Sequence, residues 1–266
     1  MKEIVFTFIM SLTMLMANGQ PKQGRVVYER TVEVQMFVQG SEENEMRPPL
    51  PPSRKDKLEV LFGNNQSLCR TIDDEMPDPD IDQPGPRMHV MIAGADDITY
   101  ADFTTGRIIV QRELGTKNYI VSDSIHRLSW KLTGDTATIL DYPCQEAVAY
   151  RVEKHPMMTM DNGEMKSRDV TDTARIAVWF TLSIPVPAGP EYAGQLPGLI
   201  LGIDINDGRT VYKAVSISDK VDLADIKEPS KGKKVTAEEF AEQSAKLMKE
   251  MQRNGPERGR DIRFGP

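Results

Sequence analysis

Residues 173–216 read TARIAVWFTLSIPVPAGPEYAGQLPGLILGIDINDGRTVYKAVS. They contain the longest apolar runs of the chain and a dense set of turn residues. Residues 174–182 are rich in β-branched and aromatic side chains, and this composition predicts a strand. Pro185 and Pro187 lack the amide proton that a strand ladder needs, so we expect this strand to end near Ile184.

A second apolar run follows over residues 199–205. Residues 206–208, Asn-Asp-Gly, predict a tight hairpin turn, and residues 210–217 alternate between apolar and polar as the returning strand. Two strands joined by a Gly/Pro-rich loop, followed by a hairpin, predict the centre of an antiparallel sheet.

The segment Gln195-Leu196-Pro197-Gly198-Leu199-Ile200 resembles the motif that gives the GLPGLI family its name. That family consists of exported proteins of certain Gram-negative gut and oral bacteria. The resemblance extends upstream through residues 178–186 and, in order and spacing, covers roughly residues 119–205. The motif positions are Trp179, Pro185, Gly189, Pro190, Gly194, Leu196, Pro197, Gly198, Leu199 and Ile200.

Gln195 stands where the family has its first glycine, so a positive φ at this position would strain the loop. The resemblance implies no activity, ligand or catalytic residue. We interpret Pro197-Gly198 between apolar residues as a sharp bend that leads into a buried strand. The spacing of Gly194, Gly198 and Gly202 is also that of packed membrane helices, but the apolar run is far shorter than the roughly 20 residues that a span requires.

The chain has 266 residues, a net charge of −7 and 39% hydrophobic residues, which suits one globular domain. The negative charge argues against a nucleic-acid partner. Residues 1–19 have the pattern of a signal peptide, and no later segment is apolar enough to span a membrane. We expect a periplasmic or secreted protein.

Export changes the interpretation of Cys69 and Cys144, the two cysteines of the chain. In an oxidising compartment a disulfide between them would persist. The alternative is two buried, unpaired thiols on separate strands, and the sequence leaves both open.

The rest of the β-rich domain, residues 20–218, shows short strands separated by turn residues. Residues 24–38 predict the first strand, residues 73–86 an acidic loop, and residues 133–135, Thr-Gly-Asp, a turn between strands. The spacing predicts a mainly β fold (α+β): a curved antiparallel sheet or half-barrel with one C-terminal helix.

The composition changes after residue 218. We assign residues 219–235 to a charged linker and residues 236–253 to a helix that opens with a capping box at Thr236 and Glu239. Residues 254–266 are a basic tail with the composition of a disordered segment.

The sequence shows no catalytic motif and predicts no cofactor. One group of residues has metal-ligand chemistry: His155, Met157, Met158 and Met160, in what we expect to be a loop between strands. Thioether and imidazole ligands favour Cu(I). The competing interpretation treats these methionines as apolar filler.

We therefore expect an exported, soluble, non-enzymatic binding or accessory protein of the cell envelope. Its ligand is unknown, and the concave sheet face is the expected site for an apolar ligand or a peptide. The resemblance suggests a partner in outer-membrane transport machinery. The alternatives are Cu(I) binding through the methionine segment and, third, an unrecognised hydrolase.

Overall fold

A computed structural model describes residues 22–33, 53–72, 97–161 and 164–253 of the chain. The predicted signal peptide, acidic loop and basic tail lie outside the described residues. So do residues 34–38, the last third of the predicted first strand.

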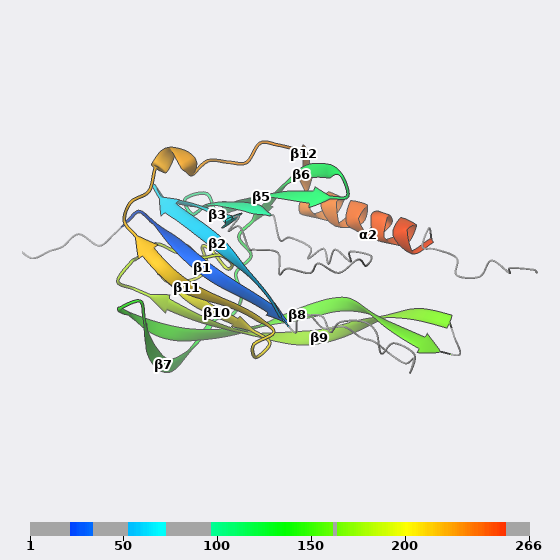
Figure 1. Cartoon of the computed structure of the whole chain (residues 1–266), viewed down its shortest axis with the longest axis horizontal. Helices are drawn as coiled ribbons and strands as arrows, with labels where there is room; N and C mark the ends of the chain where they lie inside the picture. Colours follow the sequence, from blue (N-terminus) through cyan, green and yellow to red (C-terminus); the bar gives the residue numbers. More distant parts are fainter. Residues whose placement is uncertain (1–21, 34–52, 73–96, 162–163, 254–266) are drawn as a thin grey trace, which may run out of the picture.

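The described residues form twelve strands and one α-helix (Figure 1). In chain order the elements are β1 (Gly24–Glu33), β2 (Ser53–Gly63), β3 (Gln66–Ile72), β4 (Ile98–Asp102), β5 (Arg107–Leu114), β6 (Lys117–Ser124), β7 (Lys131–Ile139), β8 (Tyr142–Asp161), β9 (Glu164–Thr181), β10 (Leu199–Ile205), β11 (Thr210–Ser218), the 3-10 turn η2 (Leu223–Asp225), β12 (Lys233–Thr236) and α2 (Ala237–Arg253).

All twelve strands belong to one open sheet, in the order β12-β6-β5-β4-β3-β2-β1-β11-β10-β9-β8-β7. Every neighbouring pair is antiparallel except β12 and β6, which run parallel. The prediction of a mainly β fold with a curved sheet and a C-terminal helix is confirmed, and the sheet is mixed rather than purely antiparallel. Because β11 returns to pair with β1, the two halves of the chain join at the middle of the sheet.

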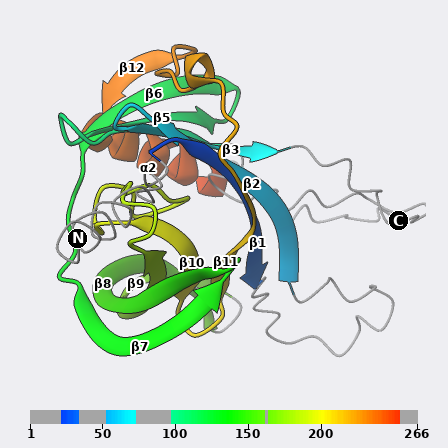
Figure 2. The ribbon, with the colours of Figure 1, turned by 90° about the vertical axis from the view of Figure 1, so that its left-hand side faces the viewer.

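The sheet is curved, and α2 lies on its concave side (Figure 2). The loop of residues 182–198, which connects β9 to β10, also lies on the concave side. Its Ile184, Val186 and Leu196 are buried in one cluster with Tyr28 of β1 and Val60 of β2. The main core is therefore the concave face of the central strands together with this loop. The packed side chains occupy the surface that the sequence suggested for an apolar ligand.

The central strands follow the predicted pattern closely. β9 ends at Thr181, before the prolines. The β10–β11 hairpin turns at Asn206, Asp207 and Gly208, which all have positive φ. Asn and Asp tolerate this backbone region better than other non-glycine residues, and Gly adopts it freely.

The predicted turn at residues 133–135 is wrong. These residues lie inside β7, at a register shift between Leu132 and Thr136 against β8, and Gly134 has a φ of +91°. The chain reverses instead at Leu140 and Asp141, both with positive φ. A glycine with positive φ suits a bulge as well as a turn, and the sequence did not distinguish the two.

Residues 219–232, which we call the strap, cross the opposite, convex face of the sheet. Their Val221, Leu223 and Ile226 pack against a second cluster that includes Leu61 of β2 and Tyr100 of β4. The segment predicted as a charged linker thus covers apolar surface, and its end forms β12.

The capping box forms at the start of α2. The Glu239 backbone N–H donates to Thr236 Oγ1 at 3.2 Å, and the Thr236 N–H donates to the Glu239 carboxylate at 3.0 Å. These bonds satisfy two amides that the first helical turn leaves without partners. The helix therefore begins directly after β12 and turns back onto the concave side, where Phe240 packs against Tyr119.

Candidate functional site

The bend at Gly198 brings two backbones into close contact. A Cβ at this position would lie 2.0 Å from the carbonyl oxygen of Thr181, the last residue of β9. Leu199, Ile200 and Leu201 are fully buried, whereas Pro197 is exposed. The bend therefore feeds an apolar strand into the core next to β9, and it lies away from the lysine pocket described below.

The other motif positions also have packing neighbours. Gly189 lies against Ile200, and Gly194, with a φ of +80°, lies against Ile125. Pro190 is buried, Pro185 is exposed, and Trp179 of β9 is half-buried.

Gln195 is not among the residues with positive φ, so the strain considered for it does not arise. Its side-chain oxygen instead accepts two hydrogen bonds, from the Leu128 backbone N–H at 3.0 Å and from Trp130 Nε1 at 3.1 Å. A glycine has no side chain to provide these bonds. Gln195 thus ties the loop to the segment that leads into β7.

A charged network lies on the concave face beside the same loop. Arg30 of β1 donates through Nε to Asp56 of β2 at 2.8 Å and through Nη2 to the second carboxylate oxygen. The Tyr212 hydroxyl of β11 donates to the Glu191 carboxylate of the loop at 2.7 Å. Hydrogen bonds and burial shift the pKa values of Arg30 and Tyr212. The hydrogen bond to Asp56 raises the pKa of Arg30, and burial, with Glu191 adding to it, raises the pKa of Tyr212.

Both groups therefore stay protonated near neutral pH, and the network joins three strands and the loop. Its geometry is that of a structural anchor rather than of an acid–base pair.

Cys69 of β3 and Cys144 of β8 are both buried, and neither forms a disulfide. Burial, assisted by the nearby Glu191 carboxylate, raises the pKa of the Cys69 thiol to about 12. Burial also raises the pKa of Cys144, whose thiol donates to the Tyr142 carbonyl at 3.4 Å. A protonated, buried thiol is a poor nucleophile.

His155, Met157, Met158 and Met160 belong to β8, which pairs with β9 along this part of its length. The predicted loop at these positions is therefore wrong. Their side chains lie outside the described part of the structure. Among the side chains that are described, no three of the types His, Cys, Asp and Glu converge as metal ligands do.

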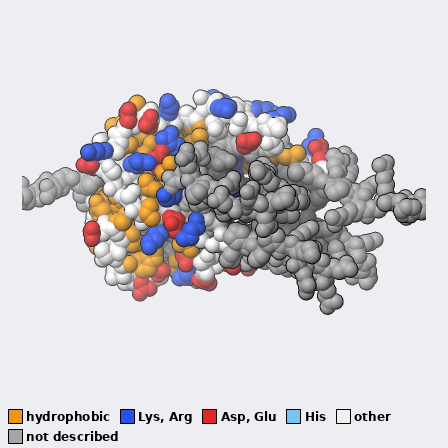
Figure 3. All heavy atoms as spheres, viewed as in Figure 1, with side chains coloured by type: hydrophobic (Ala, Val, Ile, Leu, Met, Phe, Trp, Pro, Cys, Tyr) orange, Lys and Arg blue, Asp and Glu red, His pale blue; other side chains and the backbone are white. Residues whose placement is uncertain are grey.

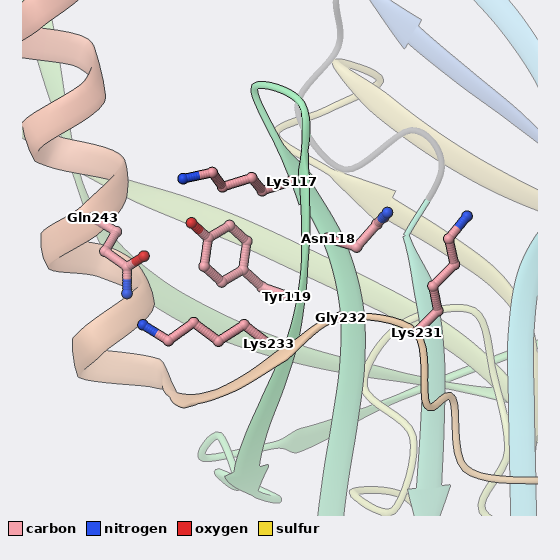
Figure 4. A pocket seen from close by; sticks show the side chains of 7 residues that line it. All are labelled: Lys117, Asn118, Tyr119, Lys231, Gly232, Lys233 and Gln243. Atoms are coloured by element: carbon pink, nitrogen blue, oxygen red, sulfur yellow. The ribbon is translucent and has the colours of Figure 1, made fainter.

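A pocket of about 420 Å³ opens where the strap reaches the edge of the sheet (Figure 4). Its walls come from the start of β6, the junction of the strap with β12, and one face of α2. The lining residues are Lys117, Asn118, Tyr119, Lys231, Gly232, Lys233 and Gln243. We call this site the lysine pocket.

Gly232 makes this arrangement possible. It has a φ of +142°, and a Cβ here would lie 2.7 Å from the backbone carbonyl atoms of Asn118. Only glycine combines this φ with so close an approach. The strap can therefore cross the sheet edge against β6, which places Lys233 on the same side of β6 as Lys117 and leaves Lys231 on the other side (Figure 4).

The pocket carries three positive charges without a compensating negative one. Within the described residues, Lys117, Lys231 and Lys233 form no ion pair with a carboxylate. Tyr119 is only 7% exposed, and its ring packs edge-on against Phe240 with centroids 5.6 Å apart. The guanidinium of Arg112 lies 5.8 Å from the same Phe240 ring. These contacts hold the Tyr119 ring in place while its hydroxyl reaches the pocket (Figure 4).

Lysine ammonium groups, a phenol and two amides together offer hydrogen-bond donors and positive charge. Such a set suits an anionic ligand. The sequence analysis missed this site, although Lys231, Lys233 and Lys234 surround Gly232 within four residues. Lys117, on the β6 wall of the pocket, lies more than a hundred positions earlier in the chain.

Residues 130–202 match a family described as "Protein of unknown function (Porph_ging)". The match spans 73 of the 266 residues and includes the bend at Gly198. The lysine pocket lies outside it on both sides. No curated protein matches the chain.

The fold resembles that of a solved protein, "Structure of PNGF-II in C2 space group", with a TM-score of 0.50 and 15% identity. The alignment covers 84% of this chain and 33% of that one, so this chain spans about a third of the length of its structural neighbour. A second form, "Structure of PNGF-II in P21 space group", has a TM-score of 0.49 and 16% identity, with 85% and 34% covered. At this identity the likeness concerns the fold alone.

In the part of the chain that the structure describes, no helix has the length and apolarity needed to cross a bilayer.

Proposed function

We propose that this protein is an exported, non-enzymatic binding protein of the cell envelope that takes an anionic ligand in the lysine pocket. We further propose that it belongs to the GLPGLI family and that it works beside outer-membrane transport machinery. The matched stretch at residues 130–202 contains the GLPGLI-like segment, which is consistent with this assignment.

The observation that carries the proposal is the uncompensated charge of the pocket. Surface lysines commonly lie near carboxylates, but Lys117, Lys231 and Lys233 all line this pocket and have no such partner among the described residues. Lys117 and Lys233 point to the same side of β6 (Figure 4). Like charges repel one another, so an anion bound between these two lysines relieves that repulsion and forms charge-assisted hydrogen bonds. The cavity volume is within the roughly 300–1,000 Å³ typical of small-molecule sites.

The composition of the pocket lining supports binding rather than catalysis. Its described lining holds no carboxylate, histidine or cysteine.

The proposal is tested by calorimetric titration of the purified mature protein with inorganic sulfate, inorganic phosphate and galacturonate at low ionic strength. We expect one anion to bind per chain. Changing Lys117 or Lys233 to glutamine should weaken binding by about 1.4- to fivefold each, because exposed charge pairs contribute roughly 0.2–1 kcal/mol.

Lys213→Gln is the matched control. Lys213 is an exposed lysine on β11, seven strands from β12 in the sheet order. Its replacement removes the same charge and should leave affinity unchanged. An equal loss of affinity in Lys213→Gln would show that the effect comes from net charge rather than from the pocket, and no anion binding at all would refute the proposal.

A further inference from the structure

The donors of the lysine pocket form two sets on opposite sides of the β6 backbone. Lys117, Tyr119, Lys233 and Gln243 direct their polar ends into the space between β6 and α2 (Figure 4). Asn118 and Lys231 point to the other side of the strand. The two sets are separated by the close crossing of Gly232 over Asn118, where the strap turns from one side of the sheet edge to the other.

A single compact anion reaches only one of these sets, because the crossed backbones lie between them. A longer ligand reaches both if it carries a charge for each side of the edge. Two further exposed lysines lie next to the pocket along the chain: Lys234 follows in β12, and Lys227 precedes in the strap. Glu228, the acidic residue between Lys227 and Lys231, is paired with Arg107 and does not cancel them.

Lys and Arg side chains also lie along the upper margin of the molecule in Figure 3, with Asp and Glu side chains among them. The positive charge extends beyond the pocket only from Lys227 to Lys234, because Asp219, Asp222 and Asp225 precede these residues in the strap. A linear ligand that passes over the edge would meet Lys227 or Lys234 after leaving the cavity.

On this basis, and resting on the proposed anion-binding function, we infer that the ligand is a linear acidic polysaccharide. Successive charged sugars of one chain would engage Lys117 and Lys233 on the helix side and Lys231 on the other side. Lysine is a point charge and binds carboxylate and sulfate alike, so the shared feature is a repeated anionic group on a glycan.

The uncharged side chains of the pocket, those of Asn118, Tyr119 and Gln243, favour a glycan over a nucleic acid as the ligand. Single-stranded nucleic acids bind through stacking of bases on exposed aromatic faces. The one aromatic side chain of the pocket is Tyr119, whose ring is buried against Phe240, so it offers a hydroxyl and no stacking face. Asn118 and Gln243 carry amides that both donate and accept, as needed for the hydroxyls of sugars.

The test compares a polymer with its monomer on the full mature chain. Polygalacturonate and dextran sulfate represent the carboxylate and sulfate sources, galacturonate is the monomer, and neutral dextran is the uncharged control. In the wild type we expect at least one acidic polymer to bind about tenfold or more tightly than the monomer, because the second contact becomes intramolecular. Neutral dextran should not bind.

Lys231→Gln separates the two sides of the edge. Since Lys231 is exposed, the variant should fold as the wild type does, which circular dichroism and thermal unfolding verify. In Lys231→Gln, the polymer should bind little more tightly than the monomer, and the affinity for the monomer should stay that of the wild type. Lys117→Gln should weaken the binding of both the polymer and the monomer. Lys213→Gln should change neither.

Three results would overturn the inference while leaving anion binding intact. Polymer and monomer with equal affinity per site would show that only one charge is engaged. An equal loss for polymer and monomer in Lys231→Gln would place Lys231 in the same subsite as Lys117. A single-stranded oligonucleotide that binds more tightly than both polysaccharides would assign the edge to nucleic acid.

Discussion

Replacing Gly198 with alanine should destabilise the protein strongly, although the change adds only one methyl group. The added Cβ would lie 2.0 Å from the Thr181 carbonyl oxygen and 2.8 Å from its carbonyl carbon. Both atoms belong to the backbone of β9, so no side-chain rotation relieves the contact.

The size of the effect follows from this geometry. Carbon–oxygen contacts in proteins are comfortable at about 3.4 Å or more, so the two backbones must separate by roughly 1.4 Å. That separation strains the Leu199–Thr181 pair, with which β10 begins its ladder against β9. Overpacking of this kind costs about 1–3 kcal/mol, and one weakened backbone hydrogen bond adds about 1 kcal/mol. We therefore expect a loss of about 2–4 kcal/mol in the free energy of unfolding.

Urea unfolding followed by tryptophan fluorescence measures this loss. With a slope of about 3 kcal/mol per molar urea, the midpoint should fall by roughly 1 M. Gly202→Ala is the matched control, because Gly202 belongs to the same strand and its nearest neighbour, Trp179, lies at an ordinary 3.5 Å. A Gly198→Ala midpoint within 0.2 M of that control would refute the reasoning that the bend depends on close backbone contact.

Three further changes test the anchors of the concave face. Arg30→Met should lower the free energy of unfolding in urea by about 3–5 kcal/mol, because it leaves the Asp56 carboxylate without its partner in a site where that side chain is only 14% exposed. Adding Asp56→Leu should recover most of that loss. Gln195→Ala removes an acceptor for two hydrogen bonds and should cost about 1–3 kcal/mol, with a red shift of tryptophan emission. Cys69 should resist a thiol reagent at pH 9 in the native protein and react once unfolded in urea. Burial raises the pKa of the folded Cys69 thiol from 9.0 to about 12. The stability that the protonated thiol contributes is therefore complete below pH 9 and is lost as the pH rises toward 12. Cys69→Ala should not show this loss.

Local sequence patterns predicted the central part of the fold well. The end of β9 before Pro185, the Asn206–Gly208 hairpin and the capping box at Thr236 all depend on residues within a few positions of one another. Backbone preferences and missing amide protons act at that range, so they can be read directly from the chain.

The patterns were less reliable where one residue type serves two purposes. Gly134 suits both a turn and a bulge, and its place inside β7 depends on how that strand pairs with β8. Gln195 looked strained where a glycine was expected, but its side chain meets donors some 65 positions away. Residues close in sequence reveal neither the pairing of β7 with β8 nor the two donors that bind Gln195.

The amino-acid sequence by itself determined that the chain is rich in strands and that a Pro-Gly bend leads an apolar segment into the core. Only the tertiary structure decided where charge accumulates. Lys117 and Lys233 come together because β12 pairs in parallel with β6 at the sheet edge, and Gly232 lets the strap cross there. The choice of that partner strand depends on burying Val235 beside Tyr119 and on covering the convex face with the strap. These are long-range packing energies, which the spacing of lysines along the chain does not reveal.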